Sequence, residues 1–268
     1  MSEFVLLSEK RDGVFAAMRE CGKLMRAAHD METTDGAITD KAGSANFVTV
    51  YDLKVQEKLI LALAELFPTA GFFAEEKENP PELLEQGLCF IIDPIDGTTN
   101  FIHGLHCSAI SVALYEKKQP LFGAVYDPYM DEMFWAVRGQ GAFLNDRPIR
   151  VAYRPLEKAL VAFGSSPYNR LELGNTFFQK LYAVFLATAD IRRGGSAALD
   201  LCNVAAGRTD VFFEEVLSPW DYAAGILILS EAGATVTDLR GQPLKIGEKS
   251  SVLTANAVLH HKMLGLLS

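Results

Sequence analysis

The spacing of hydrophobic and polar residues changes character along the chain. Residues 4–29 and 52–67 carry apolar side chains at helical spacing, which predicts two amphipathic helices. Short apolar runs typical of strands follow at 88–92, 108–115, 121–126 and 133–137. Gly, Pro and Asp separate the later runs, and this punctuation favours a mostly antiparallel sheet. Residues 142–151, with Asn145-Asp146 at their centre, are expected to form a hairpin.

Beyond about residue 155 the pattern becomes an alternation of strands and helices. Strands are expected near 160–163, 190, 210–214, 234–237 and 251–255. Helices are expected near 172–188, 197–206, 220–231 and 257–267. We therefore predict an α+β half over residues 1–154 and an α/β half over residues 155–268. Because no long Pro- or Ser-rich linker separates them, the halves are expected to form one compact unit.

Composition narrows the class of protein. With 268 residues, 49% of them apolar and 22% charged, the chain can bury a large core, so disorder is unfavourable. The balance of 25 basic and 34 acidic residues gives a net charge of −9. No stretch collects the lysines and arginines that bind a phosphate backbone, so direct binding of nucleic acid is not expected.

Cysteine usage and hydropathy indicate where the protein works. Cys21, Cys89, Cys107 and Cys202 are scattered and form no C-x-x-C pair, so they are expected to be core thiols in a reducing compartment. The first residues hold only a four-residue apolar run, too short for a secretion signal, and no later run reaches membrane-spanning length. A cytoplasmic protein without membrane contact is predicted.

The stretch DPIDGTTN, residues 93–100, directly follows the apolar run 88–92. It places Asp93 and Asp96 at the mouth of a strand, with Pro94 fixing the backbone between them. Two carboxylates at one point require a proton or a cation, and ligands that are all oxygen favour Mg²⁺ first and Mn²⁺ second. Gly97 allows close approach to the backbone and could begin a short helix with an anion site. The alternative is that both aspartates are only turn and N-cap residues.

Further acidic residues stand at the ends of other predicted elements. Glu75 and Glu76 follow the strand-like run 71–73, Asp52 begins the second predicted helix, and Asp221 lies in the first turn of another. Each has a structural explanation, as a solvated turn, an N-cap or a complement to the helix dipole. Four separate acidic sites at element ends nevertheless exceed what core packing requires.

These motifs, taken together, resemble the inositol monophosphatase family. The resemblance rests on residues 91–101 (IIDPIDGTTNF), on Glu75-Glu76, on 220–225 (WDYAAG) and on 192–200 (RRGGSAALD), and it spans nearly the whole chain. Related 3′-phosphoadenosine 5′-phosphate phosphatases tend to have Lys-Glu at the positions of Thr99-Asn100. The inositol monophosphatase branch of the family is therefore the better match. The resemblance implies a layered αβαβα sandwich, a Mg²⁺-dependent and lithium-sensitive phosphatase, and a homodimer.

Transferred position by position, the resemblance assigns two or three metal ions to one site. It implies that one Mg²⁺ is bound by Glu75, Asp93 and the carbonyl of Ile95. A second ion is implied between Asp93, Asp96 and Asp221, and Glu75 would share a weaker third through water. The residues implied in catalysis are Glu75, Thr98, Asp52 and Lys41.

The resemblance also implies a substrate side. The backbone amides of Gly97 and Thr98 are expected to bind the phosphate, beside Asp96. Gly195, Ser196, Ala197 and Glu214 are expected to contact the hydroxyl groups of a sugar or cyclitol. Arg192 and Arg193, beside this loop, are candidate ligands for a second phosphate of a larger substrate, with a solvated strand end as the alternative.

Hydrolysis of inositol 1-phosphate is therefore the leading functional prediction. Fructose 1,6-bisphosphate and NADP(H) are alternative substrates, since relatives of the family accept them. A different class of function also stays open, because some bacterial relatives act as partners of the transcription machinery, a role that need not require catalysis.

Overall fold

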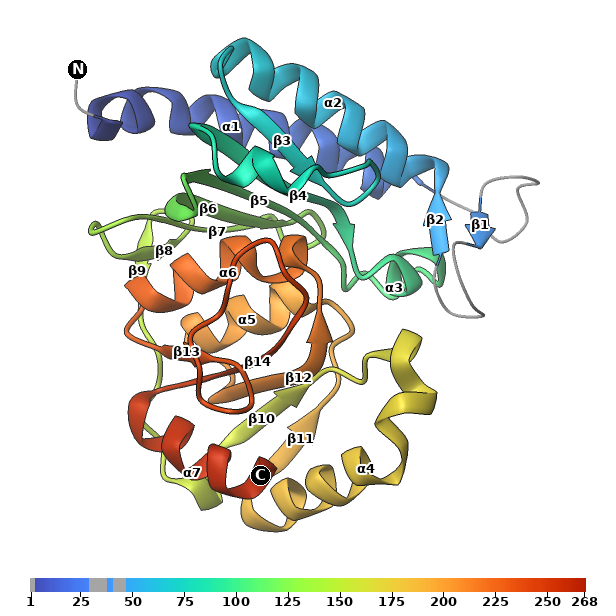
Figure 1. Cartoon of the computed structure of the whole chain (residues 1–268), viewed down its shortest axis with the longest axis vertical. Helices are drawn as coiled ribbons and strands as arrows, with labels where there is room; N and C mark the ends of the chain where they lie inside the picture. The colour runs from blue at the N-terminus through green and yellow to red at the C-terminus, as the bar shows by residue number, and fades with distance from the viewer. Residues whose placement is uncertain (1–2, 29–37, 41–46) are drawn as a thin grey trace.

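The computed structural model describes residues 3–28, 38–40 and 47–268, and for residues 3–8, 40, 47, 48 and 81 it describes the backbone alone. Helices and sheets alternate from one end of the molecule to the other in the order αβαβα (Figure 1). The layered sandwich expected from the resemblance is thus confirmed.

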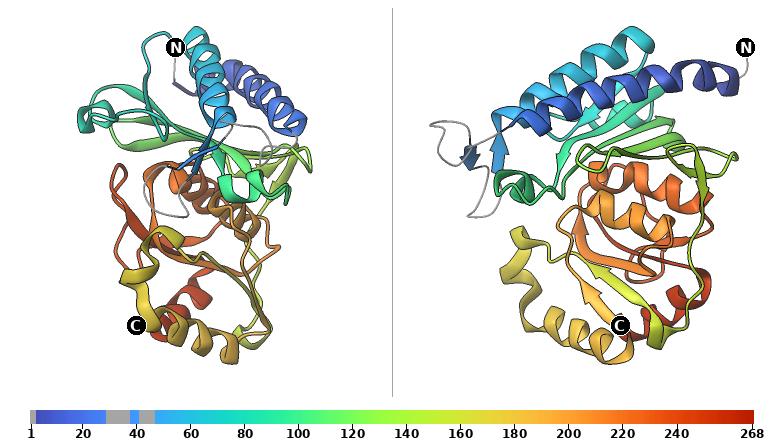
Figure 2. Two further views of the ribbon diagram at one scale, coloured as in Figure 1. Left: turned by 90° about the vertical axis from the view of Figure 1, so that its right-hand side faces the viewer. Right: turned by 180° about the vertical axis from the view of Figure 1, so that it is seen from behind.

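The outer helices of the first half are α1 (Glu3–Ala27) and α2 (Val50–Leu66). They cover one face of a seven-stranded sheet, as the side views show (Figure 2). Met18, Leu59 and Leu63 are fully buried on the faces turned to the sheet. The helical spacing of these apolar residues explains why this part of the chain forms amphipathic helices.

The first sheet has the order β3-β4-β5-β6-β7-β8-β9. Its strands are β3 (Gly71–Ala74), β4 (Leu88–Asp96), β5 (Ala109–Glu116), β6 (Gln119–Asp127), β7 (Glu132–Val137), β8 (Ala142–Leu144) and β9 (Arg147–Ile149). All neighbouring pairs are antiparallel except β3 with β4, so the predicted sheet type is confirmed. β8 and β9 form the predicted hairpin around Asn145-Asp146.

The middle layer consists of α5 (Ala197–Ala205) and α6 (Pro219–Glu231), which lie between the two sheets (Figures 1 and 2). α6 is apolar on almost all sides because it is enclosed between them. Gly123 of β6 lies directly against it: a Cβ at this position would come within 2.8 Å of the carbonyl oxygen of Ala224. The glycine therefore lets α6 approach the first sheet closely.

The second sheet has the order β11-β10-β12-β14-β13. Its strands are β10 (Leu160–Phe163), β11 (Asp190–Arg192), β12 (Val211–Leu217), β13 (Thr235–Thr237) and β14 (Ser250–Ala255). β11, β10 and β12 run parallel, whereas β14 is antiparallel to β12 and β13. The outermost helices, α4 (Arg170–Ala187) and α7 (Ala257–Leu267), complete the sandwich.

Several features were absent from the sequence prediction. β1 (Ile38–Asp40) pairs with β2 (Phe47–Thr49), and β4 continues to Asp96 instead of ending at Ile92. A short helix, α3 (Thr98–Ile102), does follow Gly97, as expected. The predicted division at residue 154 falls in the connector between β9 and β10. The grouping of the two halves into one compact unit stays a prediction.

Two expectations about the whole chain can be compared with the structure. Cys21, Cys89 and Cys202 are buried, Cys107 is half-buried, and all four are free thiols. Among the described helices, none combines the length and apolarity that crossing a membrane would need.

Candidate active site

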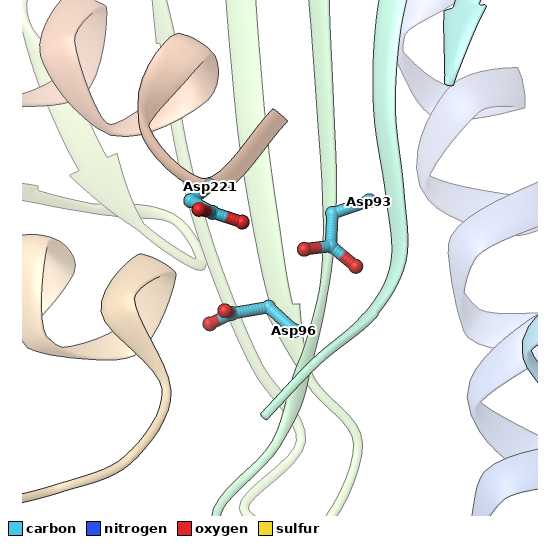
Figure 3. A group of neighbouring side chains, drawn as sticks. All are labelled: Asp93, Asp96 and Asp221. Carbon is cyan, nitrogen blue, oxygen red and sulfur yellow. The ribbon is translucent and has the colours of Figure 1, made fainter. Parts of the chain in front are cut away.

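A β-bulge in β4 turns two predicted metal ligands toward a common point. Asp93 pairs with Ser111 of β5, whereas Asp96, three residues further along β4, pairs with Ala109, only two residues along β5. In an unbroken strand, residues three apart point to opposite faces, and the extra residue removes this alternation. Pro94 lies inside the bulge, one of the few places where a central strand accepts proline. The carboxylates of Asp93 and Asp96 therefore converge (Figure 3).

The third carboxylate comes from the first turn of α6. Asp221 forms a capping box with Ser218, whose backbone N–H donates to the Asp221 carboxylate at 2.7 Å. The hydroxyl of Ser111 donates to the carbonyl of Trp220 at 3.3 Å, which ties this helix start to β5. One carboxylate oxygen each of Asp93, Asp96 and Asp221 lies within 4.8 Å of the other two. A helix cap and a strand bulge thus form one cluster of three aspartates (Figure 3).

Burial and mutual repulsion disfavour the charged forms of these acids. Burial raises the pKa of Asp93 well above its ordinary value, and the charges of Glu75 and Asp96 raise it further. Burial also raises the pKa of Asp96 to about 6, although hydrogen bonds to its carboxylate oppose the shift. The pKa of Asp221 is raised by burial and then by Asp96. In the described part of the chain, no lysine or arginine forms an ion pair with any of the three.

This donor set fits a hard divalent cation. It consists of carboxylate oxygens that are close together and largely buried, and no basic side chain within the described ranges forms an ion pair with them. Mg²⁺ and Mn²⁺ prefer such oxygen ligands, and a dication would relieve the repulsion that raises the pKa values. The residues present therefore match the metal that the sequence predicts.

Glu75 stands beside the three aspartates at the end of the edge strand β3. Its backbone N–H donates to the carbonyl of Ile92 on β4 at 3.2 Å, and its side chain lines the same cavity as Asp93. Glu76 does not line the cavity, and its backbone N–H donates to the side-chain oxygen of Gln56. Of the predicted acidic pair, Glu75 is the member placed at the site.

Thr98 and Asp52 lie together, as the resemblance implies. The Thr98 hydroxyl donates to the carbonyl of Ile95 at 3.1 Å and lies 3.4 Å from the Asp52 carboxylate. Asp52 is fully buried, and burial raises its pKa to about 7, although two hydrogen bonds from Thr49 oppose the shift. The alternative explanation of Asp52 as an N-cap is wrong: Thr49 caps α2, and Asp52 is the third residue of this helix and accepts from the Thr49 backbone in the capping box.

A cavity of about 360 Å³ joins these residues to the second half of the chain. Glu75, Asp93 and Thr98 line it from the first half, whereas Arg193, Glu214 and Asp221 line it from the second half. The site therefore lies between the first sheet and the α/β layers. Lys41, the remaining predicted catalytic residue, lies outside the described residues.

The predicted substrate loop forms one wall of the cavity. Gly195, Ser196 and Ala197 all line it. The Ser196 hydroxyl donates to the Asp96 carboxylate, and the backbone N–H of Ala198 donates to the same oxygen at 2.9 Å. The loop thus orients a predicted metal ligand as well as facing the cavity.

Glu214 lines the cavity from β12 and is held by Ser166. The backbone N–H and the hydroxyl of Ser166 donate to one oxygen of the Glu214 carboxylate at 2.9 and 3.1 Å. A Cβ on Gly164 would lie 1.8 Å from the other oxygen, so the glycine leaves room for the carboxylate. Burial raises the pKa of Glu214 to about 7. A strong hydrogen-bond acceptor is therefore fixed in the cavity wall.

Arg192 is the predicted substrate residue that the structure does not bring to the cavity. Its exposed guanidinium pairs with Asp190, two residues earlier and so on the same face of β11. The next residue, Arg193, lines the cavity instead. Of the two predicted arginines, Arg192 is therefore ruled out as a ligand in the cavity, and Arg193 stays the candidate for a second phosphate.

Sequence reasoning missed several residues of the site. Ser166 has a left-handed backbone (φ 38°) and lies far from any recognised motif, so no sequence signal identified it. Asp200 lines the cavity and ends the quoted motif RRGGSAALD, which could have indicated it. Burial raises the pKa of Asp200 to about 8. Asn100 lies within the motif of residues 91–101, which by itself indicates no role for it.

Comparison with known proteins identifies the family of the chain. A sequence profile of the inositol monophosphatase family matches residues 7–268. The chain is 38% identical over 252 residues to the inositol-1-monophosphatase of Mesorhizobium japonicum, which covers 94% of this chain and 92% of that protein. It is 40% identical over 226 residues to Nus factor SuhB of Escherichia coli K12, which covers 84% of this chain and 83% of that protein.

A solved structure shows the same architecture. The extragenic suppressor protein suhB from Bartonella henselae matches with a TM-score of 0.88 at 37% identity, covering 96% of this chain and 98% of that one. Together with the carboxylate cavity, these matches define a phosphatase that hydrolyses phosphoric monoesters. The chain belongs to the inositol monophosphatase family.

Proposed function

We propose that the protein hydrolyses inositol 1-phosphate with Mg²⁺ at the cluster of Asp93, Asp96 and Asp221. The observation that carries this proposal is the convergence of the three carboxylates within 4.8 Å, in a cavity that Gly97 and Thr98 also line. The relatives named inositol-1-monophosphatase support the choice of substrate.

In the proposed arrangement, Glu75, Asp93 and the carbonyl of Ile95 would hold one ion, and Asp93, Asp96 and Asp221 would hold another. Mn²⁺ is expected to substitute for Mg²⁺, and Glu75 is expected to contribute to a weaker third site. Uncatalysed hydrolysis of a phosphate monoester is very slow. Bound ions would speed it by neutralising the charge of the phosphate and by lowering the pKa of a bound water.

The residues of the chain have separate tasks in this reaction. The backbone amides of Gly97 and Thr98 hold the phosphate beside Asp96. Glu75 takes the proton of the attacking water. Thr98 and Asp52 orient that water through the contact between the Thr98 hydroxyl and the Asp52 carboxylate, 3.4 Å apart. Lys41 is expected to lie near the metals, as the resemblance implies.

The alcohol part of the substrate would be held by the opposite wall. Glu214, fixed by Ser166, accepts a hydrogen bond from a substrate hydroxyl, and Gly195, Ser196 and Ala197 line the wall beside it. Arg193 provides a guanidinium for substrates with a second phosphate, such as fructose 1,6-bisphosphate or NADP(H). These esters are the alternative substrates.

Release of inorganic phosphate tests the proposal. Purified protein with Mg²⁺ is offered inositol 1-phosphate, fructose 1,6-bisphosphate, NADP and 3′-phosphoadenosine 5′-phosphate in parallel. The highest kcat/KM is expected for inositol 1-phosphate, with inhibition by lithium as in the family. Folded protein that releases phosphate from none of the four would refute the proposed activity.

A binding role is the second candidate, because relatives named Nus factor SuhB match at 40% identity. In that role the protein would act as a partner of the transcription machinery without catalysis. The net charge of −9 argues against direct contact with nucleic acid, so the contact would be with protein. Asp93→Asn separates the roles, since binding to transcription proteins in a pull-down should survive this substitution and phosphatase activity should not.

The exposed face of α4 supports the homodimer that the family implies. Phe178, Tyr182, Phe185 and Leu186 follow helical spacing and expose 66, 63, 48 and 66% of their surface. An apolar stripe of this kind marks an interaction surface. A symmetric dimer would bury it against the same stripe of a second copy.

A cytoplasmic location is proposed as well, consistent with the four free thiols.

A further inference from the structure

Asn100 links α3 to the substrate loop by hydrogen bonds that lie outside the cavity. It is the third residue of α3 and only 2% exposed, and it does not itself line the cavity. Its side-chain nitrogen donates to the carbonyl of Cys107 at 2.7 Å and to the carbonyl of Gly194 at 2.9 Å. The second bond spans 94 positions of the chain and reaches the substrate loop of the other half.

The chemistry of this contact demands a carboxamide. The side-chain nitrogen of asparagine carries two hydrogens, and the two carbonyl oxygens take one each. A carboxylate of the same shape would have no hydrogen to donate and would face both carbonyl oxygens. An apolar side chain would leave both carbonyls without this donor in a buried place. The two hydrogen bonds are therefore specific to the residue type.

The substrate loop packs tightly against Gly97, the residue whose amide is proposed to bind the phosphate. A Cβ on Gly97 would lie 3.0 Å from the carbonyl oxygen of Gly195. A Cβ on Gly195 would lie 2.8 Å from the side-chain nitrogen of Asn100. Because backbone meets backbone here, a shift of the Gly194 carbonyl moves the cavity wall directly. The position of the loop is thus set from α3.

We infer that Asn100 is a positioning residue that sets the placement of the substrate alcohol relative to the phosphate. It holds the Gly194 carbonyl, and through it the wall formed by Gly195, Ser196 and Ala197, at a fixed distance from Gly97 and Thr98. The inference rests on the proposed function and extends it, because it assigns selectivity for a hydroxylated alcohol to a residue that touches no substrate.

Asn100→Asp tests the inference, since it keeps the shape of the side chain and removes both donors. Activity is measured with inositol 1-phosphate, whose hydroxyls would contact the loop, and with p-nitrophenyl phosphate, which lacks them. For inositol 1-phosphate, kcat/KM is expected to fall by about ten-fold or more, mainly through KM, because small misplacements of a bound substrate are costly. For p-nitrophenyl phosphate the fall is expected to stay within about three-fold, because the loop makes no hydroxyl contact there and the hydrogen bonds of Ser196 and Ala198 still hold Asp96.

Asn256→Asp is the matched control. Asn256 is also buried and donates through its side-chain nitrogen to one carbonyl, that of Ala152 at 2.9 Å, but it caps α7 away from the cavity. This variant should leave the ratio of the two activities unchanged. If Asn100→Asp does not fold, Asn100→Ala carries the same test, because it removes the donors without adding a charge.

The outcomes separate this inference from the proposed function. Equal losses on both substrates, or no loss on either, would overturn the positioning role while leaving the phosphatase in place. Wild-type protein inactive on both substrates would overturn the phosphatase, and amide hydrogen exchange then decides the inference. Exchange at Gly195 and Ser196 should be about ten-fold faster in Asn100→Asp than in Asn256→Asp if Asn100 holds the loop. Unchanged exchange at these amides would refute the role.

Discussion

Glu214 shows at the residue scale how the fold prepares an acid that lies outside the aspartate cluster. It is 8% exposed and receives two hydrogen bonds from Ser166, so its carboxylate has a fixed direction into the cavity. Glu214→Gln is expected to lower kcat/KM for inositol 1-phosphate by about ten-fold or more, because a substrate hydroxyl loses a charged acceptor.

Steady-state kinetics check this expectation. The loss should appear mostly in KM, with the Mg²⁺ dependence unchanged, because Glu214 is not a proposed metal ligand. A loss of Mg²⁺ affinity in Glu214→Gln would instead place the residue among the metal ligands and contradict the assignment.

The raised pKa of Glu214 also predicts how stability depends on pH. Burial raises this pKa from 4.5 to about 7 in the folded protein. Between these values the folded state binds more protons than the unfolded state, so stability falls as pH rises from about 4.5 to about 7. Below pH 4.5 the raised pKa does not change the free energy of unfolding with pH, and above about pH 7 the full loss of stability has been reached.

Thermal unfolding in the presence of a chelator measures this effect. Wild-type protein should lose more stability between pH 5 and pH 8 than Glu214→Gln does, by an amount on the order of 1–3 kcal/mol. Equal losses in the two proteins would show that Glu214 is charged at little cost in the folded state.

At the scale of elements, the site depends on how β4 joins α3. Gly97 connects them with a left-handed backbone (φ 88°), and a Cβ there would lie 3.0 Å from the carbonyl oxygens of both Cys107 and Gly195. Gly97→Ala should therefore strain the backbone and also push the two walls of the cavity apart. We expect a loss of stability of about 1–3 kcal/mol and a fall in kcat of about ten-fold or more.

Gly104→Ala is the control for the backbone strain alone. Gly104 also has a positive φ of 61°, but nothing lies within 4 Å of the place where a Cβ would be. This variant should lose about 1 kcal/mol of stability and keep its kcat. Similar kcat values in both alanine variants would show that the close approach at Gly97 is not needed for activity.

The elements themselves could largely be predicted from the sequence, because each has a distinct periodicity. The apolar spacing in α1 and α2 and the short runs of the first sheet were sufficient. The bulge in β4 could not be predicted, because it depends on pairing with Ser111 and Ala109 of the next strand. For the same reason the sequence predicts that the strand ends at Ile92. The cap of α2 is a separate, local error, because Thr49 and Asp52 both belong to one capping box and Thr49 is its N-cap.

At the scale of the whole molecule, the site exists only because the two halves meet. Asp93 and Asp96 come from the first sheet, and Asp221 comes from a helix more than a hundred positions later (Figure 3). The spacing of these residues in the sequence does not predict that they share a site. That prediction came from the motifs that the chain shares with the family. Ser166 lies in no such motif, and the motif that contains Asn100 indicates no role for it, so only the three-dimensional contacts identify what these two residues do.

The apolar stripe on α4 makes a prediction about assembly. Phe178→Asp places a charge within this stripe and should shift the protein from dimer to monomer in sedimentation velocity experiments. Tyr153→Asp is the control, because Tyr153 is 72% exposed in the connector between the two sheets. A monomeric wild type, or a dimer that persists in Phe178→Asp, would contradict the proposed interface.

The central claim is that Asp93, Asp96 and Asp221 bind the Mg²⁺ on which hydrolysis depends. It is tested most directly by phosphate release from inositol 1-phosphate as a function of Mg²⁺ concentration, in wild type, Asp93→Asn and Asp127→Asn. Asp127 is a buried acid outside the cavity that accepts from the backbone N–H groups of Tyr129 and Met130, so its variant controls for loss of a buried charge. Wild type and Asp127→Asn should show saturable, chelator-sensitive activity, whereas folded Asp93→Asn should show a loss of about a thousand-fold or more. Mg²⁺-dependent activity retained in folded Asp93→Asn would contradict the account.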